Sequence, residues 1–433
     1  MKLLPALRWT WVAAIVAVLP CRADELNGLR SSICRAGDVN GDGVPDLMVA
    51  SRDLPNRGSV WILSGKDGAI IRVVEGREAC SRFGAWLAQL SDLNRDGVPD
   101  LAVGCRGAGC EPTSHYARVF SGRDGKLLLE LTDGWIVVSI DDVDEDGTSD
   151  LLVGDPDRPG HTKTPVVTAR SGRDGHVLYT VEPPGPSGPH CEFGSSFALL
   201  GDIDADGMRD YAVGSLGPCT SAEYRGWIGI YSGGGGTLLA EARGVPDAGL
   251  GWSLASIEDL DDDGHPDLLA GALHRYVDVL SGKDLHRLSR DRSRGGFAIC
   301  DAFGSSLDRL GDVDFDCVPD WIVGANEYAS MFDEGYARVL SGRTGRELWI
   351  GLQGEEGVDV CGVDDVDADG VPDFALSTES KWHADSGRPP PDGKLPPQQT
   401  QSIQLISSKD WRTLWTTDLC ILRKEAPVAD RPK

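Results

Sequence analysis

The sequence predicts an all-β protein that is built from seven repeats of one four-stranded unit. Three signatures support this prediction, and they recur in the same order along the chain: a Phe-Gly pair, an acidic nonapeptide and a Ser-Gly turn. The composition agrees, because 55 Gly and 25 Pro among 433 residues indicate many turns and disfavour long helices. Apolar residues make up 40% of the chain, which is enough for a core.

The acidic nonapeptide, D-x-[DN]-x-D-[GC]-x-x-D, occurs seven times, at intervals of 50 to 60 residues. Each copy leads directly into a short apolar run, such as 47–50 or 101–104, which predicts a strand. Self-similarity with a period of this length is typical of propellers and solenoids. The copies begin at Asp38, Asp92, Asp142, Asp202, Asp259, Asp312 and Asp365.

The Ser-Gly signature follows each acidic loop. Full copies with a basic residue and a Gly begin at Ser64, Ser121, Ser171 and Ser341, and looser copies begin at Ser232, Ser281 and Ser407. Because β-rich runs flank them, these segments are interpreted as hairpin turns. A phosphate-binding loop is the alternative for residues 232–237, but the Lys that such a loop requires is missing.

The Phe-Gly pair precedes the acidic loop by nine residues. It is complete at Phe83, Phe193 and Phe303, close to complete at Leu250, and eroded at residues 29, 133 and 356. One strand after this pair, one after the acidic loop and two around the turn give four strands per unit. Seven such units predict a seven-bladed β-propeller. One domain over residues 24–420 then replaces the two or three that the length suggests.

These motifs resemble the FG-GAP repeat of integrin α-subunit N-terminal propellers and of many secreted bacterial proteins, and the resemblance covers residues 29–416. It implies structural calcium ions on one rim of the propeller. It also implies that ligands bind on the opposite face, through loops between the blades. The candidate ligand loops are Gly107–His115, Pro156–Thr164, Leu216–Tyr224 and Asn326–Glu334.

The acidic loops are predicted to bind Ca²⁺, up to seven ions in all. Calcium takes six to eight hard oxygens in flexible geometry. Positions 1, 3, 5 and 9 supply carboxylates or an amide, position 7 supplies a backbone carbonyl, and Gly at position 6 permits the chain reversal. Without a cation, carboxylates this close would repel one another. Magnesium is disfavoured because it demands stricter octahedral geometry. Solvated acidic turns without metal are the remaining alternative.

The predicted ligands, in the order of positions 1, 3, 5, 7 and 9, are Asp38, Asn40, Asp42, Val44, Asp46; Asp92, Asn94, Asp96, Val98, Asp100; Asp142, Asp144, Asp146, Thr148, Asp150; Asp202, Asp204, Asp206, Met208, Asp210; Asp259, Asp261, Asp263, His265, Asp267; Asp312, Asp314, Asp316, Val318, Asp320; and Asp365, Asp367, Asp369, Val371, Asp373.

An EF-hand is the competing interpretation of these loops, and it fails. It needs a bidentate Glu at position 12, where this chain has Val, Ala or Leu in all seven copies, and a strand rather than a helix is predicted to follow. The sixth loop departs from the pattern because Cys317 replaces the Gly at position 6. We expect that site to be distorted or empty, since a side chain disfavours the backbone conformation that the turn requires.

The termini predict export. Residues 1–23 resemble a signal peptide, with basic residues, an apolar run of 12 residues and small residues before a cleavage site after Ala23. A lipoprotein reading of Cys21 is disfavoured by the preceding Pro20. A Pro-rich insertion over residues 378–401, a plausible partner-contact segment, interrupts the last repeat, and residues 421–433 form a C-terminal tail. No further segment is long enough to span a membrane.

An exported chain with ten cysteines after the signal favours disulfides over buried free thiols. Equivalent positions in two repeats suggest the pairs Cys80–Cys110 and Cys191–Cys219, although Cys105 competes with Cys110. Cys34 and Cys361 share a position four residues before their acidic loops. The remaining pairings stay open.

The charge excludes one function class. The 42 Lys and Arg against 68 Asp and Glu give a formal net charge of −26, so a nucleic-acid binder is not expected. The favoured hypothesis is a secreted or cell-surface, monomeric binding or adhesion module with a protein or carbohydrate ligand. A structural component of an envelope assembly is one alternative, because a fold does not determine a function.

A propeller enzyme is the other alternative. A polysaccharide lyase or hydrolase would want convergent residues such as His115, Tyr116, His190 and Tyr224, but their spacing does not select them. The eight His form no zinc spacing, and no nucleophile elbow occurs. Trp349 and Trp415 follow their turns in a pattern that resembles the tryptophan docking motif of quinoprotein propellers. The pattern occurs only in the last two repeats, so blade packing is favoured over a quinone site.

Overall fold

The structure is a computed structural model. It describes residues 33–50, 58–77, 82–106, 115–156, 165–184, 192–216, 225–246, 248–272, 276–292, 302–325, 335–352, 358–379 and 400–420.

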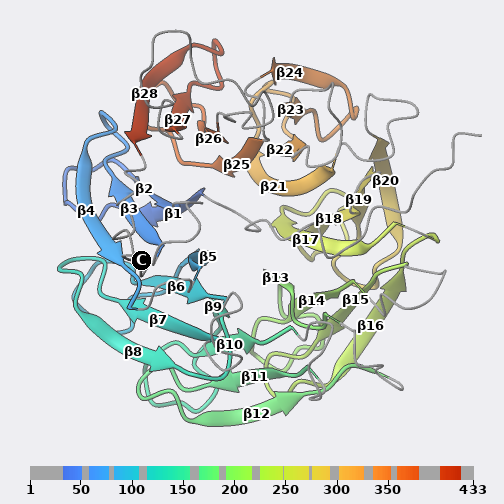
Figure 1. Cartoon of the computed structure of the whole chain (residues 1–433). Coiled ribbons are helices and arrows are strands. Elements are labelled where there is room, and N and C mark those ends of the chain that lie inside the picture. The colour runs from blue at the N-terminus through green and yellow to red at the C-terminus, as the bar shows by residue number, and fades with distance from the viewer. Residues whose placement is uncertain are drawn as a thin grey trace, which may run out of the picture.

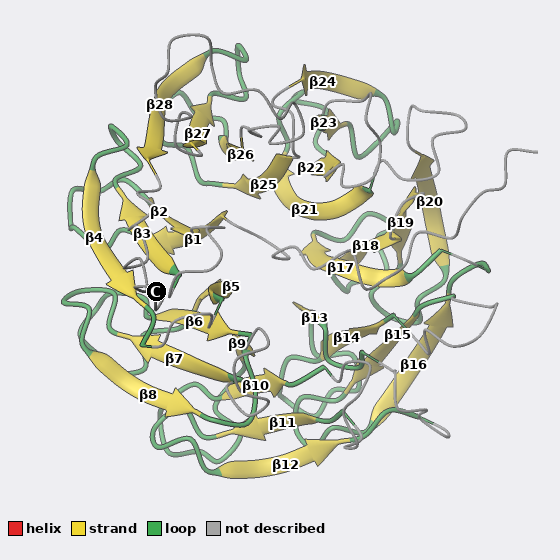
Figure 2. Cartoon of the chain, in the orientation of Figure 1, coloured by secondary structure: helices red, strands yellow, loops and turns green. Residues whose placement is uncertain are grey.

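Seven four-stranded antiparallel sheets stand around a central axis and form a closed ring (Figure 1). Each sheet consists of four strands that are consecutive in the sequence, and each contains one copy of the repeat. Strands and loops make up the parts that the structure describes (Figure 2), and no helix within them is long and apolar enough to cross a membrane. The predicted seven-bladed β-propeller is confirmed.

In each blade the strands run in sequence order from the innermost to the outermost. Blade 1 has β1 (Ile33–Gly37), β2 (Asp46–Ala50), β3 (Ser59–Leu63) and β4 (Ile70–Glu75); blade 2 has β5 (Phe83–Gln89), β6 (Leu101–Cys105), β7 (Tyr116–Phe120) and β8 (Leu127–Leu131); blade 3 has β9 (Ile136–Ser139), β10 (Leu151–Gly154), β11 (Val167–Arg170) and β12 (Val177–Val181); blade 4 has β13 (Ser196–Leu199), β14 (Tyr211–Ser215), β15 (Trp227–Tyr231) and β16 (Leu238–Arg243).

The other three blades follow the same order. Blade 5 has β17 (Leu250–Ile257), β18 (Asp267–Ala272), β19 (Tyr276–Leu280) and β20 (Arg287–Arg292); blade 6 has β21 (Phe303–Gly311), β22 (Asp320–Ala325), β23 (Tyr336–Leu340) and β24 (Glu347–Leu352); blade 7 has β25 (Val358–Gly362), β26 (Phe374–Glu379), β27 (Thr400–Ile406) and β28 (Thr413–Cys420).

The Phe-Gly pair packs one blade against the preceding one. Phe83 is 1% exposed and lies in one apolar cluster with Ala50 and Val60 of blade 1. Gly84 has φ +93°, and a side chain there would lie 2.8 Å from the Cβ of Ala50. A bulky ring therefore fills the space between the blades, while the following residue needs to be Gly for the close approach.

The Ser-Gly turns have one hydrogen-bonding pattern in all seven blades. In blade 1, the Ser64 N–H donates to the Ala69 carbonyl and the Gly68 N–H donates to the Ser64 carbonyl, both at 2.8 Å. The fifth residue of the turn has positive φ in every blade, including Leu285 and Trp411 in the looser copies. A register shift precedes each turn, so the predicted hairpins are bulged.

The outermost strands also hold the ring together at three junctions. At each of them, one side chain donates a hydrogen bond to the Ser-Gly turn of the next blade. The donor lies eight residues after the turn Ser of its own blade, and the acceptor is the backbone carbonyl of the second turn residue. Arg72 donates to Gly122 O at 2.9 Å, Tyr179 to Gly233 O at 2.8 Å, and Trp415 to Gly65 O at 2.6 Å. Three different side chains thus make the same contact. The pattern of a Trp after the turn singled out Trp415 but neither Arg72 nor Tyr179.

The second residue of the Ser-Gly turn provides a test of this packing. In blade 4, a methyl group on Gly233 would lie 2.2 Å from the carbonyl oxygen of Arg209, whereas one on Gly235 would meet nothing within 4 Å. We expect Gly233→Ala to lower the free energy of unfolding by about 1–3 kcal/mol through overpacking. Gly235→Ala is the matched control in the same turn, and it should change that free energy by less than about 1 kcal/mol. Equal melting temperatures of the two variants would contradict the packing argument.

Candidate metal centres

Each acidic loop joins the innermost strand of a blade to the second strand, and position 9 is the first residue of that strand or directly precedes it. The Ser-Gly turn of the same blade contacts the loop, so loops and turns share one rim of the ring. The local chain reversal uses positive φ at position 4, which is Gly41 or a residue with a side chain such as Arg95, and again at position 6.

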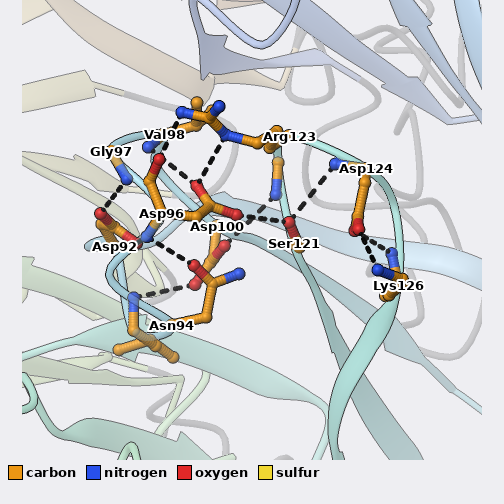
Figure 3. Close-up of polar contacts among 12 residues, drawn as sticks. Asp92, Asn94, Asp96, Gly97, Val98, Asp100, Ser121, Arg123, Asp124 and Lys126 are labelled. Carbon is orange, nitrogen blue, oxygen red and sulfur yellow. Dashed lines mark hydrogen bonds and ion pairs between the residues drawn. The ribbon is translucent and has the colours of Figure 1, made fainter.

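Position 1 organises the loop backbone. In the second loop, Asp92 accepts the Asp96 N–H at 3.0 Å and the Gly97 N–H at 2.7 Å (Figure 3). The same two contacts, from positions 5 and 6, occur in all seven loops. The backbone N–H groups thus hold this carboxylate before any ion binds.

Positions 3 and 5 are held by the backbone in the same way. The Asn94 side-chain oxygen accepts the Asp96 N–H at 2.9 Å, and Asp96 accepts the Val98 N–H at 3.0 Å. The contact from position 7 to position 5 recurs in every loop, and the contact from position 5 to position 3 recurs in the first five. The backbone therefore also orients the side chains at positions 3 and 5.

Position 9 has a second role that the sequence analysis missed. Asp100 accepts the Leu93 N–H at 2.8 Å on one oxygen and the Gly122 N–H at 3.3 Å on the other. All seven loops repeat this bridge between the loop and the turn of their blade, with the Ser408 N–H replacing a glycine N–H in blade 7. The position-9 carboxylate therefore ties loop to turn, whether or not it also binds an ion.

Burial governs the protonation of these bridging carboxylates, which are all 0% exposed. Desolvation disfavours the charged form. It raises the pKa of Asp46, Asp100, Asp267, Asp320 and Asp373 to about 6, and it also raises the pKa of Asp150 and Asp210. A cation beside them would favour the ionised form and oppose this shift.

The Ser-Gly turn contributes further contacts to the loop. In blade 2, the Ser121 hydroxyl donates to Asp96 at 3.0 Å, and the Arg123 guanidinium lies 3.5 Å from the same carboxylate (Figure 3). Ser232, Ser281 and Ser407 contact position 5 in their own blades. The sequence analysis did not include these serines in the site. The regular order in which the Ser-Gly turn follows each acidic loop is the sequence feature that could have identified them.

The carboxylates come together closely enough to share one ion. In five loops, three ligand oxygens lie within 4.8 Å of one another: Asp142, Asp144, Asp146; Asp202, Asp204, Asp206; Asp259, Asp261, Asp263; Asp312, Asp314, Asp316; and Asp365, Asp367, Asp373. Oxygens around one Ca²⁺ stand about 5 Å apart at most, given bond lengths of about 2.3–2.6 Å. The first two loops have Asn40 and Asn94 at position 3 instead.

Two oxygens in these loops also need a partner. Asp314 Oδ1 and Asp367 Oδ1, both at position 3, are buried from water and accept no hydrogen bond. A buried carboxylate oxygen without a donor is costly, and a cation is the partner that would satisfy it. The donor set consists of hard oxygens in a flexible loop, which fits calcium.

The sixth loop keeps the geometry of the others despite Cys317. This residue has φ +66°, and its N–H donates to Asp312 at 2.8 Å, as the Gly N–H does elsewhere. Phe315 at position 4 also has positive φ, and its side chain is 66% exposed. The contacts of position 1 therefore show no distortion, whereas the contact from position 5 to position 3 is described only in the first five loops. Position 4 is a non-Gly residue with positive φ in six of the seven loops, so the strain that is particular to the sixth loop lies at Cys317.

Several predictions concern residues that the structure does not describe. These are the signal peptide, the tail, most of the insertion and of the four candidate ligand loops, the pairs Cys80–Cys110 and Cys191–Cys219, and the residues His190 and Tyr224. Cys34, Cys317 and Cys361 lie in described segments and form no disulfide. Burial raises the pKa of Cys34 to about 11 and also raises that of Cys361, so both are neutral thiols.

Comparisons with known proteins agree with the geometry. Residues 38–103 match the model of the FG-GAP-like repeat. The chain is 27% identical over 250 residues to integrin alpha-8 of Gallus gallus and 32% identical over 246 residues to integrin alpha-3 of Mus musculus. These matches cover 55% and 53% of this chain but 19% and 18% of the relatives, so the match spans about a fifth of their length.

A solved structure shows the same fold. The chain resembles BBS1N, in the crystal structure of its complex with ARL6DN soaked with lead, with a TM-score of 0.52 and 12% sequence identity. The match covers 81% of this chain and 89% of that one. At this identity the similarity concerns the fold alone.

Strain at Cys317 can be tested directly. We expect Cys317→Gly to raise the free energy of unfolding by about 1 kcal/mol, because Gly adopts positive φ without the steric penalty. Thermal melting in excess chelator measures the effect without a contribution from bound metal. Gly264→Cys, at position 6 of the fifth loop, should show the opposite shift. Loss of stability in Cys317→Gly would contradict the strain.

Proposed function

Because this chain is a seven-bladed propeller of FG-GAP-like repeats that resembles integrin α-subunits, we propose that it is a secreted or cell-surface calcium-binding module for binding or adhesion. Its ligand is a protein or a carbohydrate. The similarity to integrin sequences over half of the chain supports this proposal. So does the architecture, since the ring of blades leaves the loops between the second and third strands of each blade free to vary.

Calcium has a structural role in this proposal. The side chains of positions 1, 3, 5 and 9 and the carbonyl of position 7 hold up to seven ions, one in each acidic loop. Convergence of three carboxylates within 4.8 Å carries the proposal, together with the unpartnered oxygens of Asp314 and Asp367. Each ion would neutralise repulsion between carboxylates and rigidify the connection between the two inner strands of its blade.

The ligand face lies opposite the metal rim. The candidate loops connect the second and third strands of their blades, at the ends remote from the acidic loops. The formal net charge of −26 would remain negative even with seven bound Ca²⁺, so the long-range field disfavours acidic ligands. Neutral or basic surfaces are therefore the favoured ligand class.

Two alternative functions are an enzyme and a structural component of an assembly. A lyase or hydrolase would need catalytic groups on the ligand face. Among the residues considered for this role, His115 lies 2.9 Å from Asp155 and Tyr116 is adjacent to it in sequence. A structural component of an envelope assembly would use the outer rim as its interface. The ligand experiment below separates these functions.

Removal of calcium should lower the melting temperature. The unfolded chain would not hold the ions, so each occupied site stabilises the fold by about 2.7 kcal/mol at a hundredfold excess over its dissociation constant. Differential scanning calorimetry with calcium and with chelator measures the shift, and isothermal titration calorimetry counts the ions. Asp146→Ala should remove one ion, whereas the exposed turn residue Asp174 can be changed to Ala as a control. An unchanged melt in excess chelator would refute the structural role.

The ligand function is tested with the mature chain on a panel of polysaccharides and surface proteins, in calcium and in chelator. Calcium-dependent retention without new products is expected for an adhesion module. New reducing ends or unsaturated sugars would instead identify an enzyme. If nothing on the panel binds, the structural role in an assembly becomes the favoured function.

A further inference from the structure

The ring closes at the junction of blades 7 and 1. Among the described residues, every blade consists of four consecutive strands, so these two blades exchange no strand. At the other junctions the chain itself runs from one blade into the next. The first and last blades lie side by side (Figure 1), and only non-covalent contacts are described between them. We call this junction the seam.

Side chains from both blades build the seam. One apolar cluster combines Leu47 and Val49 of blade 1 with Ala375 and Leu405 of blade 7. On the outer side, the Trp415 indole N–H donates to Gly65 O at 2.6 Å, and the Thr417 hydroxyl donates to Gly68 O at 2.9 Å. Side chains of blade 7 therefore bind the Ser-Gly turn of blade 1 at the seam.

A second contact spans the seam near the central axis. Asp308 of blade 6 accepts the Gly362 N–H of blade 7 at 3.1 Å, and it lies 3.5 Å from the guanidinium of Arg35 in blade 1. The ion pair is only partly buried, with side chains 30% and 20% exposed, so its contribution to stability is modest. The Trp415 contact is the stronger candidate for holding the seam.

Gly65 connects the seam to the first acidic loop. Its carbonyl accepts the Trp415 N–H, and its own N–H donates to Asp46 Oδ1 at 3.1 Å. Asp46 is position 9 of that loop, it is 0% exposed, and its other oxygen accepts the Val39 N–H at 2.9 Å. A single glycine thus contacts both the first acidic loop and a side chain of blade 7.

The same arrangement occurs at two junctions where the chain is continuous. Gly122 lies between Arg72 and Asp100, and Gly233 lies between Tyr179 and Asp210. There the polypeptide would keep the blades together if the contact were lost. At the seam nothing of that kind is described, so the contact matters most there.

From these contacts we propose that Trp415 and Gly65 form a clasp that closes the ring and that is tightened by a cation in the first acidic loop. The inference rests on the proposed calcium sites. An ion among Asp38, Asn40, Asp42 and Asp46 fixes the carboxylate that holds Gly65, and Gly65 then presents its carbonyl to Trp415. Loss of that ion loosens the seam before the rest of the ring.

Hydrogen exchange of the full mature chain, followed by mass spectrometry, tests the clasp. Trp415→Phe keeps an aromatic side chain at this position and removes the indole N–H donor. We expect amide exchange in residues 64–69 and 413–419 to become about tenfold faster, as for the loss of one buried hydrogen bond. The matched control is Trp349→Phe at the same position of blade 6, because Trp349 stacks on Trp411 and meets Phe374 edge-on, both in blade 7, across a continuous chain. Equal exchange at the seam in both variants would overturn the clasp.

A second pair of variants tests the coupling to the metal. Asp42→Ala in the first loop should accelerate exchange at the seam in calcium, whereas Asp146→Ala in the third loop should leave the seam unchanged. In the wild-type chain, chelator should accelerate exchange at the seam, and Trp415→Phe should abolish most of that difference.

Isothermal titration calorimetry on the same samples separates the two ideas. If calcium binds but the seam exchanges equally with and without it, the coupling is wrong and the calcium proposal stands. If no calcium binds, both the metal proposal and the coupling are refuted.

Discussion

The buried carboxylate at position 9 of each acidic loop is the interaction on which the rest of the structure depends. It begins or directly precedes the second strand of the blade, and its two oxygens accept N–H groups from the loop before it and from the turn after it. A carboxylate is needed there because it is the one short side chain that accepts hydrogen bonds on both sides at once. Seven such bridges align all loops and turns on one rim, and this alignment produces both the candidate metal sites and the contacts between blades.

Adjacent blades interlock through a second relation, between position 8 of one loop and the residue directly before the loop of the preceding blade. Where position 8 is Pro, a Gly often faces it: a side chain on Gly37 would lie 3.1 Å from the ring of Pro99. Where position 8 is Arg209, the facing residue is Asp141, and the two form a close ion pair at 2.6 Å. The contact between adjacent blades is therefore made either by Gly packed against a Pro ring or by an ion pair between Asp and Arg.

The repeat made the fold predictable, because seven copies in phase leave little freedom in strand order. Loop positions 1, 3 and 5 were predictable for the same reason. The bridge of Asp100 to Gly122 was not, since it depends on how closely the turn approaches the loop in space. Nor was the equivalence of Arg72, Tyr179 and Trp415, which share a donor N–H or O–H but no residue type. Contacts between blades depend on the register of the strands and on distances in space. A sequence motif specifies residue types and does not give either of these.

The two faces of the ring are under different constraints, and this difference bears on function. On the rim that carries the acidic loops, one change affects a whole set of contacts, as at Gly65, which is bound on both its N–H and its carbonyl. Substitution there is limited to residues that keep the geometry, even at the expense of positive φ at Phe315 and Cys317. The connections between the second and third strands differ in sequence from blade to blade. A scaffold that is held by repeated contacts on one rim tolerates such variation in its other connections.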